Sequence, residues 1–171
     1  AGIAQRFVEE GARTIITDIN PEGEAVAKRL GAEFLTQDVS AERSWVDTID
    51  EVISRFGRLD VLVNNAFQPY RFDPEQRKLH WELDWADYQA QFEGAVKSAH
   101  GLAQAVLPSM LARAEGSIVN IATDLVARPI VPYHDYTTAK AALIGFSRNL
   151  AAELGPMGVR GWCGAWGWGL G

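Results

Sequence analysis

The chain has 171 residues, of which 47% are hydrophobic and 22% are charged. This length and balance are typical of one globular domain with a sizeable core, and they argue against intrinsic disorder. The formal net charge of −6 at pH 7 leaves no basic stripe to neutralise phosphates, so we expect no nucleic-acid partner.

Targeting and metal-binding signals are weak. No apolar stretch approaches the roughly 18 residues that a membrane helix needs, and the first residues do not resemble a signal peptide. We therefore expect a cytoplasmic protein without membrane contact. The single Cys163 cannot form an internal disulfide, and the three histidines share no metal-ligand spacing, so no metal is expected.

The first half of the chain alternates helical and extended patterns. It begins inside an apolar helical stripe that ends at Gly11, a residue suited to a helix C-cap. Three β-prone runs and two further helical stripes follow in strict alternation. The runs cover 14–17, 33–36 and 59–63, and the stripes extend from Pro21 to Leu30 and from Val46 to Gly57.

The second half continues the same alternation with longer helices. The polar and aromatic residues 67–83 predict a loop that covers a site. Apolar spacing predicts one long helix over 85–113, bent at Pro108. A buried strand over 117–121 and a helix that ends at Gly155 complete the pattern.

Alternating strands and helices predict an α/β fold of the Rossmann type, a doubly wound parallel sheet between two layers of helices. Ligands of such folds bind at the carboxyl ends of the strands. Four polar residues fall at or just after those ends: Asp18, Asp38, Asn64 and Thr123. No internal repeat or linker indicates a second domain.

Tyr136 and Lys140 are four residues apart near the start of a helix, so their side chains share one face. A phenol has a pKa of roughly 10, and favouring the phenolate near neutral pH requires about 4 kcal/mol, part of which a close cation can supply. The pair alone is weak evidence, because it also fits a surface tyrosine and lysine.

The surroundings of the pair resemble the short-chain dehydrogenase/reductase family. Thr123 stands thirteen residues before Tyr136 at a strand end, where the family has a serine, and Asn64-Asn65-Ala66 follows an earlier strand. The resemblance also includes Gly11-Ala12, Asp38-Val39, Leu107-Pro108 and Gly155-Pro156, and it covers residues 1–160.

The resemblance implies roles for three residues. Tyr136 would pass a proton to or from the substrate oxygen while hydride moves to or from a nicotinamide. Lys140 would lower the pKa of Tyr136 and hold the ribose hydroxyls. Thr123 would bond the substrate oxygen, since its hydroxyl is both donor and acceptor. The alternative for Thr123 is a strand-end hydroxyl bonded to its own backbone.

The resemblance also implies a nicotinamide cofactor. Asp18 could accept both adenosine ribose hydroxyls, and its charge would repel a 2′-phosphate, which favours NAD over NADP. The alternative is a turn-forming aspartate before Asn20-Pro21. By resemblance, the other cofactor contacts would come from Asp38, Val39, Asn64 and Ala66 in addition to Tyr136 and Lys140.

Three features depart from the family pattern. The first strand and its glycine-rich phosphate turn would precede Ala1 and are absent. Ala95 stands where the long helix commonly has an asparagine. After Arg160 no buried strand is predicted, and the Gly/Trp-rich residues 161–171 suggest a reading-frame shift or an incomplete gene. We therefore expect a partial domain over 1–160 followed by an atypical tail.

The sequence thus predicts an oxidoreductase of the 3-oxoacyl-reductase-like kind, which moves hydride between nicotinamide and a secondary alcohol or ketone. The parent enzyme would be a homo-oligomer. One alternative is a truncated, non-catalytic fragment or oligomerisation scaffold. Another is an isomerase or lyase of the extended branch, although Asn64-Asn65-Ala66 and its short spacing to Tyr136 argue against this.

Overall fold

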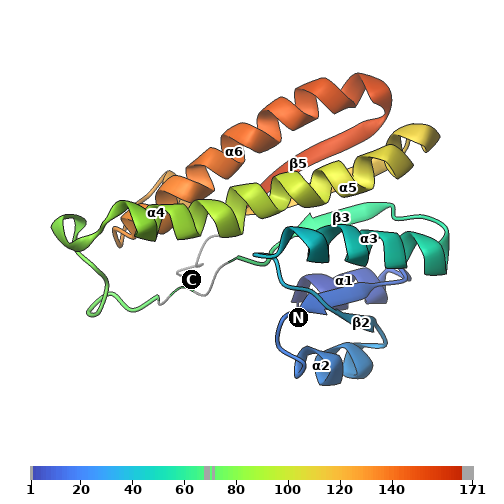
Figure 1. Ribbon diagram of the computed structural model, residues 1–171, viewed down its shortest axis with the longest axis horizontal. Coiled ribbons are helices and arrows are strands. Elements are labelled where there is room, and N and C mark those ends of the chain that lie inside the picture. The colour runs from blue at the N-terminus through green and yellow to red at the C-terminus, as the bar shows by residue number, and fades with distance from the viewer. Residues whose placement is uncertain (1, 68–69, 71, 167–171) are drawn as a thin grey trace.

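The computed structural model describes residues 2–67, 70 and 72–166. Helices and strands alternate along the chain (Figure 1). The helices are α1 (Gly2–Glu9), α2 (Gly23–Leu30), α3 (Glu42–Phe56), α4 (Trp85–Phe92), α5 (Ser98–Arg113) and α6 (His134–Leu154). The strands are β1 (Ile15–Asp18), β2 (Glu33–Thr36), β3 (Val61–Asn64), β4 (Gly116–Thr123) and β5 (Val159–Trp166).

All strand pairs are parallel, which confirms the predicted fold class. β1 pairs with β2, and β3, β4 and β5 form a second sheet with β4 at its centre. Every connection between paired strands contains a helix, as parallel pairing requires. The carboxyl ends of β3 and β4 therefore lie at one edge of the second sheet, where Asn64 and Thr123 end their strands.

The prediction that no strand follows Arg160 is wrong. β5 runs from Val159 to Trp166 and pairs with β4 along its whole length. Glycine lowers strand propensity, but at Gly161 it permits a close approach, because a Cβ there would lie 3.0 Å from Ala151 of α6. The first part of the proposed tail thus belongs to the sheet, and residues 167–171 lie outside the described part of the chain.

The predicted long helix is interrupted at a different place from the one expected. A π-helical segment, Glu93–Lys97, joins α4 to α5, whereas Pro108 lies within α5. The Ser98 hydroxyl donates to the Gly94 carbonyl oxygen at 2.6 Å, which satisfies one backbone acceptor in this segment. Ala95, at the position where the family commonly has asparagine, is buried here.

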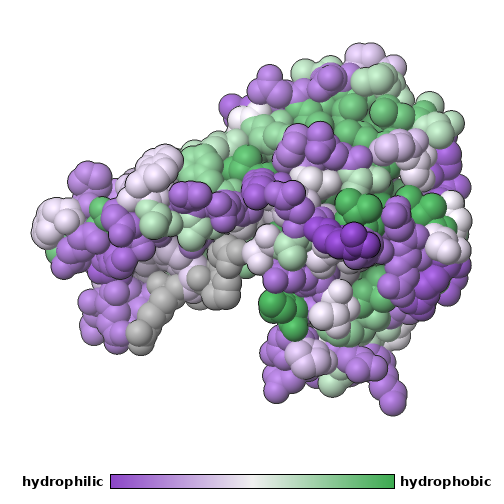
Figure 2. All heavy atoms as spheres, viewed as in Figure 1, coloured by the Kyte–Doolittle hydropathy of each residue, from purple (hydrophilic) through white to green (hydrophobic). Residues whose placement is uncertain are grey.

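The main hydrophobic core lies between the three-stranded sheet and helices α3, α5 and α6. Its buried members come from all four of these elements: Trp45, Ile49, Leu102, Ala103, Val106, Met110, Ile118, Leu154 and Val159. Figure 2 shows that further hydrophobic residues gather on the surface over α5 and α6. No helix in the described ranges is long and apolar enough to cross a membrane.

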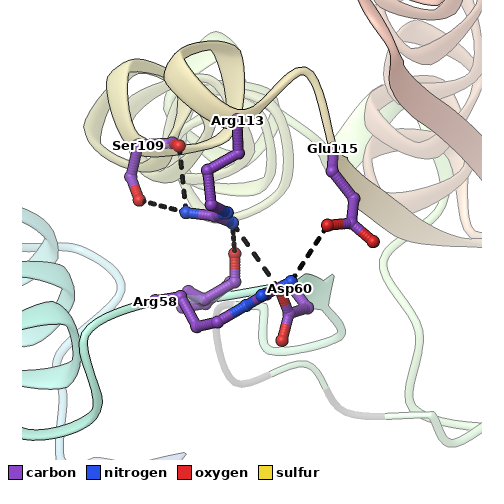
Figure 3. A network of polar contacts seen from close by, with 6 residues as sticks. Arg58, Asp60, Ser109, Arg113 and Glu115 are labelled. Atoms are coloured by element: carbon purple, nitrogen blue, oxygen red, sulfur yellow. Dashed lines mark hydrogen bonds and ion pairs between the residues drawn. The ribbon is translucent and has the colours of Figure 1, made fainter.

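A polar cluster fastens the amino-terminal ends of β3 and β4 to the end of α5 (Figure 3). Arg113 donates to the Leu59 carbonyl oxygen at 2.9 Å and to the Ser109 hydroxyl at 2.7 Å. Arg58 bonds Asp60 at 2.6 Å and Glu115 at 3.1 Å. These contacts hold the sheet at the end opposite to Asn64 and Thr123.

Two helical glycines provide a matched test of this packing. A Cβ at Gly101 in α5 would lie 2.0 Å from the buried Trp45 ring, whereas a Cβ at Gly145 in α6 would meet nothing within 4 Å. We expect Gly101→Ala to lower the free energy of unfolding by about 1–3 kcal/mol through overpacking. Gly145→Ala should raise it by up to about 1 kcal/mol, because glycine disfavours the helix.

The measurement is urea unfolding followed by circular dichroism. A Gly101→Ala variant as stable as the parent chain would contradict the close contact between α5 and the Trp45 ring.

Candidate active site

Helix α6 brings Tyr136 and Lys140 together on one face, as their spacing predicts. The Lys140 ammonium lies 5.9 Å from the centre of the Tyr136 ring. Thr123 ends the neighbouring strand β4, and all three residues are buried, with 8%, 3% and 7% of their surface exposed in the order Tyr136, Lys140, Thr123. The structure thus gathers these residues into one buried group.

The Lys140 side chain is held by the backbone of β4. Its Nζ atom donates to the Ile121 carbonyl oxygen at 2.6 Å, and it lies 5.3 Å from the centre of the Phe67 ring. Burial disfavours the ammonium form and lowers the pKa of Lys140 to about 8, while an electrostatic interaction with Cys163 acts in the opposite direction. Lys140 therefore titrates in the mildly alkaline range, about pH 8.

The electrostatic prediction for Tyr136 is not met in this structure. Burial of the phenol raises the pKa of Tyr136 above its ordinary value, hydrogen bonding with Thr123 lowers it, and the negative charge of Asp124 raises it. We expected Lys140 to lower this pKa, but here the shift comes from desolvation, Thr123 and Asp124 and not from Lys140. At neutral pH the phenol therefore carries its proton.

Thr123 adopts the strand-end arrangement that was the alternative to its substrate-binding role. Its hydroxyl oxygen accepts a hydrogen bond from the Leu125 backbone N–H at 3.3 Å, as in a strand-end turn. A hydrogen bond with the Thr123 hydroxyl also lowers the pKa of the Tyr136 phenol, against the larger effect of burial. Because a hydroxyl both accepts and donates, bonding to its own backbone leaves Thr123 able to donate within the site.

Aromatic rings from the predicted covering loop surround Tyr136. The rings of Phe67, Tyr70 and Phe72 lie 5.8, 5.3 and 5.0 Å from it, and Tyr133 packs against both Tyr70 and Phe72. This confirms that the segment after β3 covers the candidate site. Residues 68, 69 and 71 of the segment lie outside the described chain.

Asp135 anchors this cover to α6. The Tyr70 hydroxyl donates to its carboxylate at 2.7 Å, and Asp135 is itself buried. Burial and the adjacent carboxylate raise the pKa of Tyr70. Sequence reasoning missed this pair, because 65 residues separate its members; the only local signal was a carboxylate directly before Tyr136.

A series of side-chain hydrogen bonds extends inward from Asn64. Its Nδ2 atom donates to Asn120 Oδ1 at 2.8 Å, and Asn120 Nδ2 donates to the Ser147 hydroxyl at 2.8 Å. This series links β3, β4 and α6 through the sheet, and neither Asn120 nor Ser147 was predicted. The Asn64 Oδ1 atom is buried and has no hydrogen-bond donor among the described residues, so it can accept one from a bound group.

The remaining predicted cofactor residues lie at or beside the ends of β1, β2 and β3. Asp18 ends β1, is exposed, and accepts a hydrogen bond from the Asn20 backbone at 2.9 Å, so it forms a turn while facing solvent. Asp38 accepts two bonds from Ser40.

The Val39 carbonyl oxygen accepts a hydrogen bond from Trp45 at 3.0 Å, and Ala66, beyond the end of β3, is exposed. Within the described ranges, no three His, Cys, Asp or Glu side chains form a group that could hold a metal ion.

The parallel α/β architecture and the buried group of threonine, tyrosine and lysine at a strand end define a protein of the Rossmann-type dehydrogenase class. A family model described as enoyl-(acyl carrier protein) reductase matches residues 1–163. Together with the relatives below, this match shows that the chain belongs to the short-chain dehydrogenase/reductase family.

Two curated relatives illustrate the similarity. Short chain aldehyde dehydrogenase 1 of Euphorbia lathyris is 32% identical over 159 residues, which are 90% of this chain and 54% of the relative. A 3-alpha-(or 20-beta)-hydroxysteroid dehydrogenase of Mycobacterium bovis is 33% identical over 170 residues, 94% of this chain and 60% of the relative. The chain therefore spans little more than half the length of these relatives.

A solved structure shows the same similarity in three dimensions. A short-chain dehydrogenase from Streptomyces avermitilis superposes with a TM-score of 0.83 at 30% identity, over 94% of this chain and 58% of that one.

The lowered pKa of Lys140 predicts a dependence of stability on pH. Between about pH 8 and pH 10.5 the unfolded chain binds a proton at this lysine that the folded chain has released, so stability rises with pH. The free energy of unfolding of the unsubstituted chain minus that of Lys140→Met should therefore increase by about 2 kcal/mol between pH 7.5 and pH 9.5.

Chemical unfolding of both chains at each pH measures this difference, and Lys28→Met, at an exposed position of α2, is the control. A constant difference across the range would contradict the burial of the ammonium.

Proposed function

We propose that the parent enzyme of this chain is an oxidoreductase that transfers hydride between a nicotinamide cofactor and a secondary alcohol or ketone. One observation carries the proposal. In a member of this family, Thr123, Tyr136 and Lys140 share one buried group at the carboxyl end of β4. The names of the relatives, among them a hydroxysteroid dehydrogenase, agree with chemistry at a hydroxyl-bearing carbon.

The residues present fit a nicotinamide cofactor. The buried Asn64 Oδ1 atom lacks a donor among the described residues, and the Lys140 ammonium can donate to hydroxyls, because only one of its three protons is used by Ile121. Tyr136 and Lys140 would hold the nicotinamide side, and Asp18, Asp38, Val39, Asn64 and Ala66 the adenosine side. When bound, the cofactor supplies the hydride acceptor or donor.

The protein residues transfer the proton and bind the substrate oxygen. During ketone reduction the Tyr136 phenol donates its proton to the oxygen while the Thr123 hydroxyl donates a hydrogen bond to it. Alcohol oxidation requires the reverse transfer, to a Tyr136 phenolate. Because the phenol is protonated at neutral pH, the site favours proton donation, and alcohol oxidation should accelerate as the pH rises.

We propose NAD rather than NADP as the cofactor. The exposed Asp18 carboxylate at the end of β1 is followed by the exposed, uncharged Ile19. A 2′-phosphate beside Asp18 would meet a like charge without a basic partner in that turn, whereas ribose hydroxyls can donate to the carboxylate.

Removing the phenol oxygen tests the proposed proton donor. Tyr136→Phe should lower kcat by about 10²–10⁴-fold, the usual contribution of general acid–base catalysis, and should leave NADH affinity within about threefold. Turnover of a ketone panel is followed by NADH absorbance, and binding by NADH fluorescence. Tyr88→Phe in α4 is the control and should retain activity. Full turnover by Tyr136→Phe would exclude this role.

Cofactor choice is tested by titrating the chain with NADH and with NADPH under fluorescence. We expect NADH to bind at least tenfold more tightly, which corresponds to about 1.4 kcal/mol, and Asp18→Asn to reduce this ratio. Tighter NADPH binding would contradict the role of Asp18. Absence of binding to both cofactors would show that this chain is the non-catalytic fragment.

A further inference from the structure

Asp124 occupies an unusual place beside the proposed catalytic group. It directly follows Thr123 at the end of β4 and begins the short 3₁₀ turn Asp124–Val126. Its carbonyl oxygen accepts hydrogen bonds from the Ala127 and Arg128 backbone N–H groups, both at 2.9 Å. The backbone of Asp124 is therefore fixed relative to Thr123.

The Asp124 side chain has a polar atom with no use in the protein. Its Oδ1 atom is buried and receives no hydrogen bond from any described residue, and no ion pair among those residues involves Asp124. A buried acceptor without a hydrogen-bond donor destabilises the folded chain, because it has lost its bonds to water. A ligand that donates to this atom would offset this destabilisation on binding.

The neighbours of Asp124 place this residue beside the proposed catalytic group. Thr123 directly precedes it, and the negative charge of Asp124 contributes to raising the pKa of the Tyr136 phenol. The next residue, Leu125, is buried with Tyr133 and Tyr136 in the aromatic group. Asp124 thus offers a hydrogen-bond acceptor next to the aromatic group around Tyr136.

We propose that Asp124 is a specificity-determining residue, which accepts a hydrogen bond from a hydroxyl or ammonium group next to the reacting carbon. The favoured substrates are then vicinal diols, the corresponding hydroxyketones, or amino alcohols, rather than simple alcohols. The inference rests on the proposed function, because it places the reacting oxygen at Thr123 and Tyr136. The two residues that bind neighbouring substrate groups are consecutive in the chain.

Binding of three matched probes tests the proposal without turnover. The full chain is mixed with NADH, and the affinities of cyclohexanol, cis-cyclohexane-1,2-diol and 2-aminocyclohexanol are measured by ligand-observed NMR. NADH prevents oxidation of these alcohols. We expect at least one of the two-donor probes to bind about 5- to 10-fold more tightly than cyclohexanol, as one recovered hydrogen bond allows.

Two substitutions of Asp124 distinguish a hydroxyl donor from an ammonium donor on the probe. Asp124→Ala should remove the preference for both two-donor probes. Asp124→Asn retains an oxygen acceptor of the same shape without the charge, so it should keep a preference for the diol and lose one for the amine. Asp50→Asn, at an exposed position of α3, is the control and should behave as the parent chain.

The outcomes distinguish this inference from the proposed function. Equal binding of all three probes by the parent chain, or a preference that survives in Asp124→Ala, overturns the role of Asp124. A separate assay with NAD follows oxidation. If the preference is present without oxidation, the role of Asp124 as a binding residue stands and hydride transfer by this chain fails. If the probes are oxidised with equal kcat/KM and bind equally, hydride transfer stands and the role of Asp124 fails.

Discussion

The hydrogen bond from Lys140 to the Ile121 carbonyl oxygen connects helix α6 to the end of strand β4, and the geometry of the site depends on this connection. Thr123 and Asp124 follow Ile121 along the chain, whereas Tyr136 lies one turn before Lys140 on the helix. A single contact therefore sets the spacing between both halves of the group. The Asn120–Ser147 hydrogen bond supports the same pair of elements deeper in the molecule.

Burial gives this arrangement its chemical character. Around the Tyr136 ring, three aromatic rings displace water, which strengthens local electrostatic interactions and disfavours isolated charge. The pKa of Tyr136 rises and that of Lys140 falls for this shared reason. The site thus holds a protonated phenol, a lysine with a pKa of about 8, and a carboxylate with one oxygen that accepts no hydrogen bond from the described residues.

The sequence predicts the local parts of this structure well. The 3.6-residue period places Tyr136 and Lys140 on one helix face, and the β-prone run over 33–36 matches β2 exactly in extent. β5 was missed because its ladder with β4 compensates for a glycine-rich composition, which local propensity does not describe.

The site residues that were missed act through partners distant in sequence. Tyr70 bonds Asp135 across 65 residues, and Asn120 bonds the predicted Asn64 across 56, so no local pattern marks Tyr70, Asp135 or Asn120. The predicted direction of the pKa shift at Tyr136 differs from the one found for a related reason. Spacing shows that a lysine is near the phenol, but the largest cause of the shift is desolvation, and the rings of the loop after β3 bury the phenol in a way that the sequence leaves open.

The most direct test of hydride transfer follows the hydrogen itself. The chain is incubated with NAD and propane-1,2-diol that carries deuterium at its second carbon, and the recovered cofactor is analysed by mass spectrometry. Direct transfer predicts reduced cofactor that contains one deuterium, formed in proportion to the hydroxyacetone produced. Cofactor that binds to the chain but is recovered without deuterium would contradict the account.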